Sequence, residues 1–183
     1  MLNLPNILTL MRIILIPIIV MFLLTPAAWS PWVALALYIF ACVTDWFDGY
    51  YARKHNITSA FGRFLDPIAD KLLVSILLIV FAALGHLYGW WLLAACAIMF
   101  REILISGLRE YLGPHNVVIH VSALAKWKTA VQMVALGFLI LPMTVFIGQV
   151  LLSIAAILTI ITGYDYMKQG LLAMKDLEEK KND

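Results

Sequence analysis

The sequence predicts an all-α integral membrane protein, with six transmembrane helices and a short N-terminal interfacial segment. Hydrophobic residues make up 63% of its 183 residues and charged residues only 13%, whereas soluble domains are about half apolar and about a quarter charged. The three longest uncharged runs, residues 13–44, 72–100 and 129–164, contain 32, 29 and 36 residues. One membrane-spanning helix needs about 20 residues, so each run is expected to form a helical hairpin within a single domain, residues 1–183.

Turn residues and charge placement support the three hairpins and give them an orientation. Each run is interrupted near its middle by proline or glycine, namely Pro26 and Pro31, Gly85 and Gly89, and Pro142 and Gly148. All 13 Lys and Arg residues lie outside the turn regions 24–32, 84–91 and 141–149. Because Lys and Arg are concentrated on the cytoplasmic side of membrane proteins, both termini and the charged loops are expected to face the cytoplasm.

The chain in order begins with a short interfacial helix, expected to start near Pro5. Alternatives for this segment are a plain amphipathic anchor and a cleaved signal peptide, since Arg12 is followed by an apolar run. The first span is expected at residues 13–24, or from residue 8. The others are expected at residues 32–51, from 62 or 64 to 83, 90–111, from 126 onward, and 146–166, with a solvated tail from residue 168.

Four aspartates are concentrated between the second and third spans. Asp45 and Asp48 are three residues apart, and Asp66 and Asp70 are four apart, so on helices each pair shares one face. Like charges this close disfavour one another's ionisation, and hard divalent cations such as Mg²⁺ or Mn²⁺ would relieve that repulsion. The pattern therefore predicts a two-metal site for phosphoryl transfer.

Two structural roles compete with this hypothesis. Asp66 followed by Pro67 is also typical of a helix N-cap, and Asp45 and Asp48 could pair with Arg53 or Arg63. Carboxylates at a membrane edge are, however, rare and usually functional, which favours the metal site.

At every defined position, these residues resemble the signature of the CDP-alcohol phosphatidyltransferase family, in the run Asp45-x2-Asp48-Gly49-x2-Ala52-Arg53-x8-Gly62-x3-Asp66-x3-Asp70. The resemblance implies that a CDP-activated lipid donates its phosphatidyl group to an alcohol and that CMP is released. It implies that the four aspartates hold two divalent cations, Mg²⁺ or Mn²⁺, and that Asp70 is the general base. It further implies the inner (plasma) membrane of a bacterium, a homodimer and no nucleic-acid partner. The charge placement puts the aspartates, and with them the active site, on the cytoplasmic side.

The resemblance also assigns residues to the CDP-lipid. The string Pro5-Asn6-x2-Thr9-x2-Arg12 is similar to the opening of the same family. The implied contacts to the CDP-lipid come from Asn6, Thr9, Gly49, Arg53, Ser59 and Gly62. Arg53 has a planar guanidinium suited to binding phosphate. The alternative is that its side chain only snorkels to the membrane surface and binds no substrate.

A second group of charges lies in the fourth and fifth spans. Arg101 is deep in an apolar run, so it is expected to face the bundle interior, and Arg109 falls on the same helix face. Lys126 and Lys128 are about 200° apart on a helix, so at most one faces a given site. Charges that only anchor helix ends are the alternative. A basic cavity beside the aspartates would favour an anionic acceptor.

The Lys-x-Lys-Thr-x2-Gln string and the two Arg-Glu pairs resemble the branch of the family that uses glycerol 3-phosphate. The implied substrates are CDP-diacylglycerol and sn-glycerol 3-phosphate, with Arg101, Arg109, Lys126 and Lys128 binding the acceptor phosphate. Three alternatives remain open: a sibling enzyme that uses serine or inositol phosphate, an intramembrane prenyltransferase, and a divalent-cation carrier. A carrier would be expected to hold its carboxylates near the midplane of the bilayer.

Overall fold

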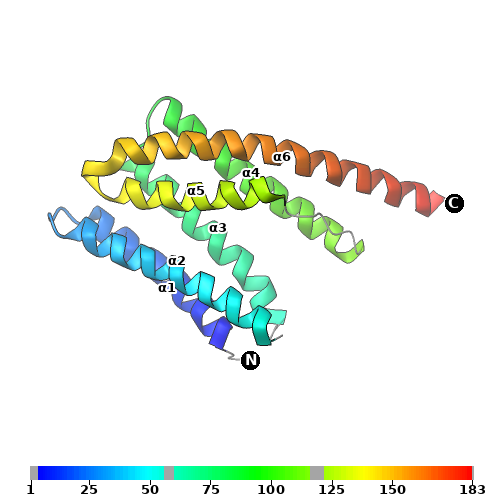
Figure 1. The fold of residues 1–183 in the computed structure, drawn as a ribbon, viewed down its shortest axis with the longest axis horizontal. Helices are drawn as coiled ribbons and strands as arrows, with labels where there is room; N and C mark the ends of the chain where they lie inside the picture. Colours follow the sequence, from blue (N-terminus) through cyan, green and yellow to red (C-terminus); the bar gives the residue numbers. More distant parts are fainter. Residues whose placement is uncertain (1–3, 56–59, 116–121, 183) are drawn as a thin grey trace. The chain divides into compact units, whose positions relative to one another are not determined.

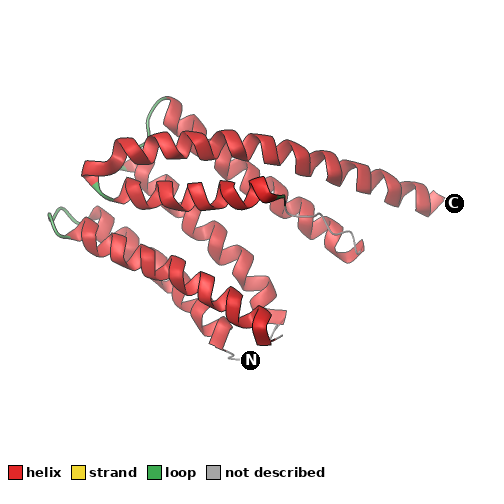
Figure 2. Cartoon of the chain, viewed as in Figure 1, coloured by secondary structure: helices red, strands yellow, loops and turns green. Residues whose placement is uncertain are grey.

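The computed structural model describes residues 4–55, 60–115 and 122–182. These residues are helical almost throughout and include no strand (Figure 2). The α-helices and two short 3₁₀ helices follow one another along the chain (Figure 1) as α1 (Leu4–Leu24), α2 (Ser30–His55), α3 (Ala60–Ala83), α4 (Trp90–Leu112), η1 (Gly113–His115), α5 (Ala123–Ile140), η2 (Pro142–Thr144) and α6 (Val145–Asn182).

Each predicted span has a helix, and four of the helices are long and apolar enough to cross a membrane. Their candidate spans are Asn6–Leu24, Trp90–Leu112, Ala123–Ile140 and Pro142–Leu177. The apolar part of α2, Ser30–Asp45, is shorter, and α3 has charged residues in its first turns. The aspartate motif occupies the end of α2 and the beginning of α3. The all-helical membrane architecture is thus supported, while six crossings stay a prediction.

At both ends of the chain the helices extend beyond the predicted spans. Within the described residues, which begin at Leu4, the expected interfacial segment is the first part of α1, which runs without a break to Leu24. Pro5 sits in the first turn of α1, where the missing N–H costs least. At the other end α6 continues past residue 168 to Asn182. The tail is rich in good helix formers, and Lys175 pairs with Glu179 one turn later at 3.7 Å.

The chain forms two compact units that alternate along the sequence. The first unit comprises residues 1–87 and 136–149, and the second comprises residues 88–135 and 150–183. The aspartate motif lies in the first unit, and the predicted acceptor-binding residues lie in the second.

In the first unit α1 packs against α2 and α3. The buried face of α1 repeats every three or four residues, as a helix face must, and consists of Asn6, Thr9, Arg12, Ile16 and Ile19. This face is polar for its first turns and apolar afterwards. The polar part contacts the aspartates, and the apolar part fills the core.

The three predicted turn regions meet at one end of the first unit. They line a cavity of about 550 Å³ that includes Pro26, His86 and Met143. His86 Nδ1 lies 3.0 Å from the carbonyl oxygen of Leu139, and Gln149 Nε2 donates a 2.7 Å hydrogen bond to the His86 carbonyl. The uncharged turns thus share one end of the unit, as their composition predicts.

In the second unit, two glycines of α6 allow α4 to approach closely. A Cβ added at Gly170 would lie 2.6 Å from Leu108 Cδ2, and one at Gly163 would lie 3.0 Å from Arg101 Cγ. Leu108 also packs in a hydrophobic core with Ile105, Leu112, Ala125 and Tyr166. The close approach places the Arg101 side chain directly against α6.

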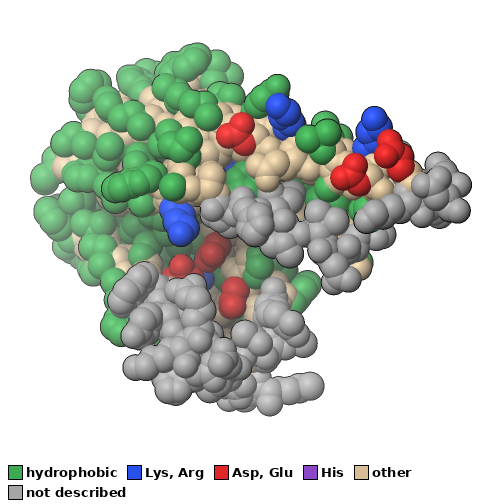
Figure 3. Space-filling view, turned by 45° about the vertical axis from the view of Figure 1, so that its right-hand side comes forward, with side chains coloured by type: hydrophobic (Ala, Val, Ile, Leu, Met, Phe, Trp, Pro, Cys, Tyr) green, Lys and Arg blue, Asp and Glu red, His purple; other side chains and the backbone are tan. Residues whose placement is uncertain are grey.

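The outer surface of the helices is strongly apolar. Hydrophobic side chains cover much of the face seen in Figure 3, and the exposed ones include Phe100, Ile103, Phe146 and Ile160. Apolar patches larger than a few hundred Å² are rare on soluble monomers. This surface is suited to a lipid bilayer, which agrees with the composition.

Candidate active site

The centre of the first unit's site is an arginine held between two aspartates. Arg12, on α1, is 1% exposed, and its Nη1 atom lies 2.6 Å from Asp45 Oδ1 on α2 and 2.6 Å from Asp70 Oδ1 on α3. Asp45 and Asp70 are themselves 42% and 56% exposed. Three helices thus bring two carboxylates and one guanidinium to one point, with the carboxylates open on their other sides.

A second contact between α1 and α3 lies one turn away. Thr9 donates a 2.6 Å hydrogen bond from Oγ1 to Asp66 Oδ1. Thr9 precedes Arg12 by three residues and Asp66 precedes Asp70 by four, so the two pairs occupy successive turns of both helices. Asp45, Asp66 and Asp70 are therefore all held near the same part of α1.

Several predicted residues lie partly or wholly outside the described part of the structure. Asp48, Gly49 and Arg53 belong to the last turns of α2, but the side chains of Asp48 and Arg53 are outside the described residues, as is the whole of Ser59. Gly62, at the start of α3, is buried. Among the described side chains, no three potential metal ligands form a group.

The described aspartates nevertheless fit a divalent cation. Each of the two Oδ1 atoms is 2.6 Å from the same nitrogen, so they lie no more than 5.2 Å apart. Carboxylate oxygens are the preferred ligands of Mg²⁺ and also suit Mn²⁺. Their partial exposure leaves further positions for water or phosphate oxygens, which Mg²⁺ usually keeps.

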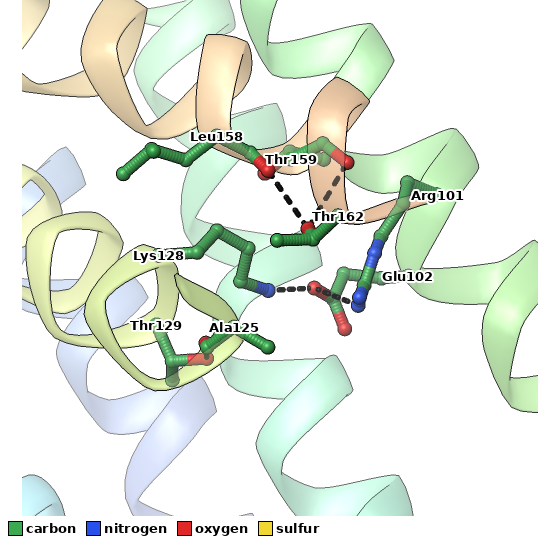
Figure 4. Close-up of polar contacts among 8 residues, drawn as sticks. All are labelled: Arg101, Glu102, Ala125, Lys128, Thr129, Leu158, Thr159 and Thr162. Carbon is green, nitrogen blue, oxygen red and sulfur yellow. Dashed lines mark hydrogen bonds and ion pairs between the residues drawn. The ribbon is translucent and has the colours of Figure 1, made fainter. Parts of the chain in front are cut away.

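In the second unit, Glu102 is the centre of a buried ionic cluster. Lys128 on α5 donates to Glu102 Oε1, and Arg101 Nη1 lies 3.4 Å from the same oxygen (Figure 4). Lys128 is 3% exposed, whereas Lys126 is exposed. The helix geometry allowed only one of the two lysines to face a site, and the buried one is Lys128.

Tyr166 of α6 joins the two arginines of α4. The guanidinium carbons of Arg101 and Arg109 each lie 5.2 Å from the centre of the Tyr166 ring. This distance allows a cation–π attraction. The predicted shared face of Arg101 and Arg109 is therefore correct, and an aromatic ring holds both side chains against α6.

Several polar atoms of this unit are buried without a hydrogen-bond partner among the described residues. They are Arg101 Nε, Gln132 Oε1, Thr159 Oγ1 and Tyr166 OH. Buried polar groups are normally paired, so such a set is typical of a place that receives a polar ligand or water. Gln132 lies one turn beyond Lys128 on α5, and Thr159 and Tyr166 are on α6.

Several of these residues could not be assigned a role from the sequence. Arg12 is part of the opening string and precedes the first apolar run, but its spacing from Asn6 and Thr9 also puts it on one helix face with them. In the sequence, Glu102 is distinguished only as the second residue of an Arg-Glu pair. Tyr166 carried no signal, because an aromatic residue near the end of a membrane helix is usually an interface residue.

Comparison with known proteins identifies the class to which this fold and site belong. The model of the CDP-alcohol phosphatidyltransferase family matches residues 2–161. The chain belongs to the CDP-alcohol phosphatidyltransferase family, which confirms the resemblance seen in the aspartate motif.

Individual relatives are similar over almost the whole chain. A protein from Cereibacter sphaeroides is 38% identical, and proteins from Shigella flexneri serotype 5b and Escherichia coli K12 are each 42% identical. Each alignment covers 95% of this chain and 98% of the relative. All three relatives are named CDP-diacylglycerol–glycerol-3-phosphate 3-phosphatidyltransferase.

Proposed function

We propose that this protein transfers the phosphatidyl group of CDP-diacylglycerol to sn-glycerol 3-phosphate, giving phosphatidylglycerophosphate and CMP. The observation that carries the proposal is the convergence of Asp45 and Asp70 on the Arg12 guanidinium, within the aspartate motif of a chain that matches the family model. The relatives' names, at up to 42% identity, support the choice of both substrates. The family match extends across both compact units, which supports a single functional domain.

The reaction needs one proton transfer and the exchange of one phosphorus–oxygen bond. The acceptor hydroxyl attacks the lipid-bearing phosphorus, the bond from that phosphorus to the CMP oxygen breaks, and CMP departs. Asp70 takes the hydroxyl proton, since its carboxylate is more than half exposed and can reach a bound substrate. Two divalent cations held by Asp45, Asp48, Asp66 and Asp70 would offset the negative charge of the diphosphate.

The acceptor phosphate is assigned to the basic cluster of the second unit. Arg101 and Lys128 together carry one positive charge more than Glu102 neutralises, and Arg109 adds another. We assign the lysine contact to Lys128 in preference to the exposed Lys126. The unpaired buried atoms Gln132 Oε1, Thr159 Oγ1 and Tyr166 OH favour a ligand that also carries hydroxyl groups.

The CDP-lipid is assigned to the start of α1 and the region between α2 and α3. Asn6 and Thr9 are buried on the face of α1 that meets the aspartates. Gly49, Arg53, Ser59 and Gly62 complete the proposed contacts. Within this group Thr9 has a second role, because its hydroxyl orients Asp66.

The protein is proposed to be a multi-pass protein of the bacterial inner (plasma) membrane, as a homodimer, with its aspartates facing the cytoplasm.

In a background where Cys42 and Cys96 are replaced by alanine, a cysteine introduced at Pro142 should react with a membrane-impermeant thiol reagent in intact cells. A cysteine introduced at His55 should react only after the cells are permeabilised. The opposite labelling pattern would reverse the orientation.

A sibling activity with serine or inositol phosphate as acceptor is the remaining alternative, because the aspartate motif serves every member of the family. The test is CMP release from CDP-diacylglycerol by the purified protein, with each acceptor added alone. Release that requires glycerol 3-phosphate supports the proposal. Release that requires another alcohol would assign the sibling activity, and no release with any of them would contradict the proposed transfer.

A further inference from the structure

Arg12 is an unusual residue for its position. It is a fully buried cation on the inner face of a helix whose following buried residues, Ile16 and Ile19, are aliphatic. A single nitrogen, Nη1, meets one oxygen of Asp45 and one oxygen of Asp70 at the same distance of 2.6 Å. These are two of the oxygens that the proposed metal site would use.

In the metal-free protein, the contact pairs charges that would be unfavourable if they were left alone. Two carboxylates within 5.2 Å of one another repel, and without a cation between them they would separate. A buried guanidinium is equally unfavourable unless it is paired. Arg12 and the two aspartates therefore depend on one another when no metal is bound.

We propose that Arg12 is a positioning residue that acts as an internal counter-cation for the metal site. It holds Asp45 and Asp70 together before metal binds, and it competes with a divalent cation for the same two oxygens. The inference rests on the proposed metal site of this enzyme. The consequence is that loss of the Arg12 charge lowers the thermal stability of the metal-free protein and raises the protein's affinity for metal.

The experiment uses the purified full-length protein in detergent, without substrate, in EDTA or in excess MnCl₂. Thermal unfolding gives the Tm in each buffer, and electron paramagnetic resonance of free Mn²⁺ gives the Kd. In Arg12→Gln the Tm should fall in EDTA, and the rise in Tm on adding Mn²⁺ should exceed that of the wild type. The Mn²⁺ Kd should fall about tenfold, because one nearby positive charge is gone.

Two further variants separate charge from packing. Arg12→Lys keeps the charge but offers fewer donors, so both of its readouts should lie between wild type and Arg12→Gln. Ile16→Ala removes a buried side chain one turn further along the same face. It should lower the Tm equally in both buffers and leave the Mn²⁺ Kd unchanged.

The outcomes distinguish this inference from the proposed function. If the wild-type protein neither binds Mn²⁺ nor shows a higher Tm in its presence, the proposed metal site itself is contradicted. A wild type that responds to Mn²⁺, with Arg12→Gln showing an equal or smaller rise in Tm or a weaker Kd, would overturn the inference alone. An Arg12→Gln protein that can be purified in a folded form only when Mn²⁺ is present would also support the inference. If Arg12→Gln is not recovered at all, a larger Mn²⁺ response of Arg12→Lys than of wild type supports the inference, and an equal one overturns it.

Discussion

Asp45→Asn, Asp48→Asn, Asp66→Asn and Asp70→Asn are each expected to lower kcat by several orders of magnitude. Asparagine keeps the size of the side chain but removes the charge with which a carboxylate binds a divalent cation. At Asp70 it also removes the proposed base. The measurement is the initial rate of CMP release under saturating substrates and Mg²⁺, for variants matched in expression and Tm.

A matched control and a chelation experiment make this prediction specific. Asp165→Asn changes an exposed aspartate on α6 to which no role is assigned, and its rate should equal that of the wild type. EDTA should abolish wild-type activity, and Mg²⁺ or Mn²⁺ should restore it. Robust turnover by the fully chelated enzyme would show that the aspartates do not act through metal.

The next largest effect is expected at the acceptor cluster. Arg109→Ala should raise the KM for glycerol 3-phosphate by about one to two orders of magnitude, while the KM for CDP-diacylglycerol moves much less. The reason is the loss of one charge-assisted contact to the acceptor phosphate, which costs about 1.5–3 kcal/mol. Arg109 is the clearest position to test, because it is exposed and has no ion-pair partner among the described residues.

Lys128 needs a different experiment, since it also pairs with the partly buried Glu102. Lys128→Ala alone would leave Glu102 with only Arg101, so Lys128→Ala should be compared with the double variant Lys128→Ala/Glu102→Gln. Both should raise the KM for glycerol 3-phosphate, whereas Lys126→Ala should change it little. If each variant weakened both substrates equally, the cluster would be structural or would bind the donor.

The positions of the helices could be predicted because apolar runs and turn residues act locally. The fourth span was expected at residues 90–111 and is found at Trp90–Leu112. The ends of the chain could not be predicted in the same way. Hydropathy marks where lipid ends, but α6 continues to Asn182, since helix propensity does not stop at the membrane surface.

The site was predictable where spacing determines geometry. Asp66 and Asp70 share a face through their four-residue spacing, and Arg101 and Arg109 share one because eight residues are about two helical turns. Contacts between helices have no such signal. The bonds from Arg12 to Asp45 and Asp70, and from Lys128 to Glu102, join residues at least 26 positions apart. They form only when the helices pack together in the folded chain.

The most direct test of the central claim is to identify the lipid product. The purified protein would be incubated with CDP-diacylglycerol, glycerol 3-phosphate and Mg²⁺, with CMP measured by chromatography and the lipid by mass spectrometry. The proposed function predicts phosphatidylglycerophosphate and CMP in equal amounts, and neither when glycerol 3-phosphate or Mg²⁺ is omitted. CMP that appears with phosphatidic acid instead, or a different lipid formed from another alcohol, would contradict it.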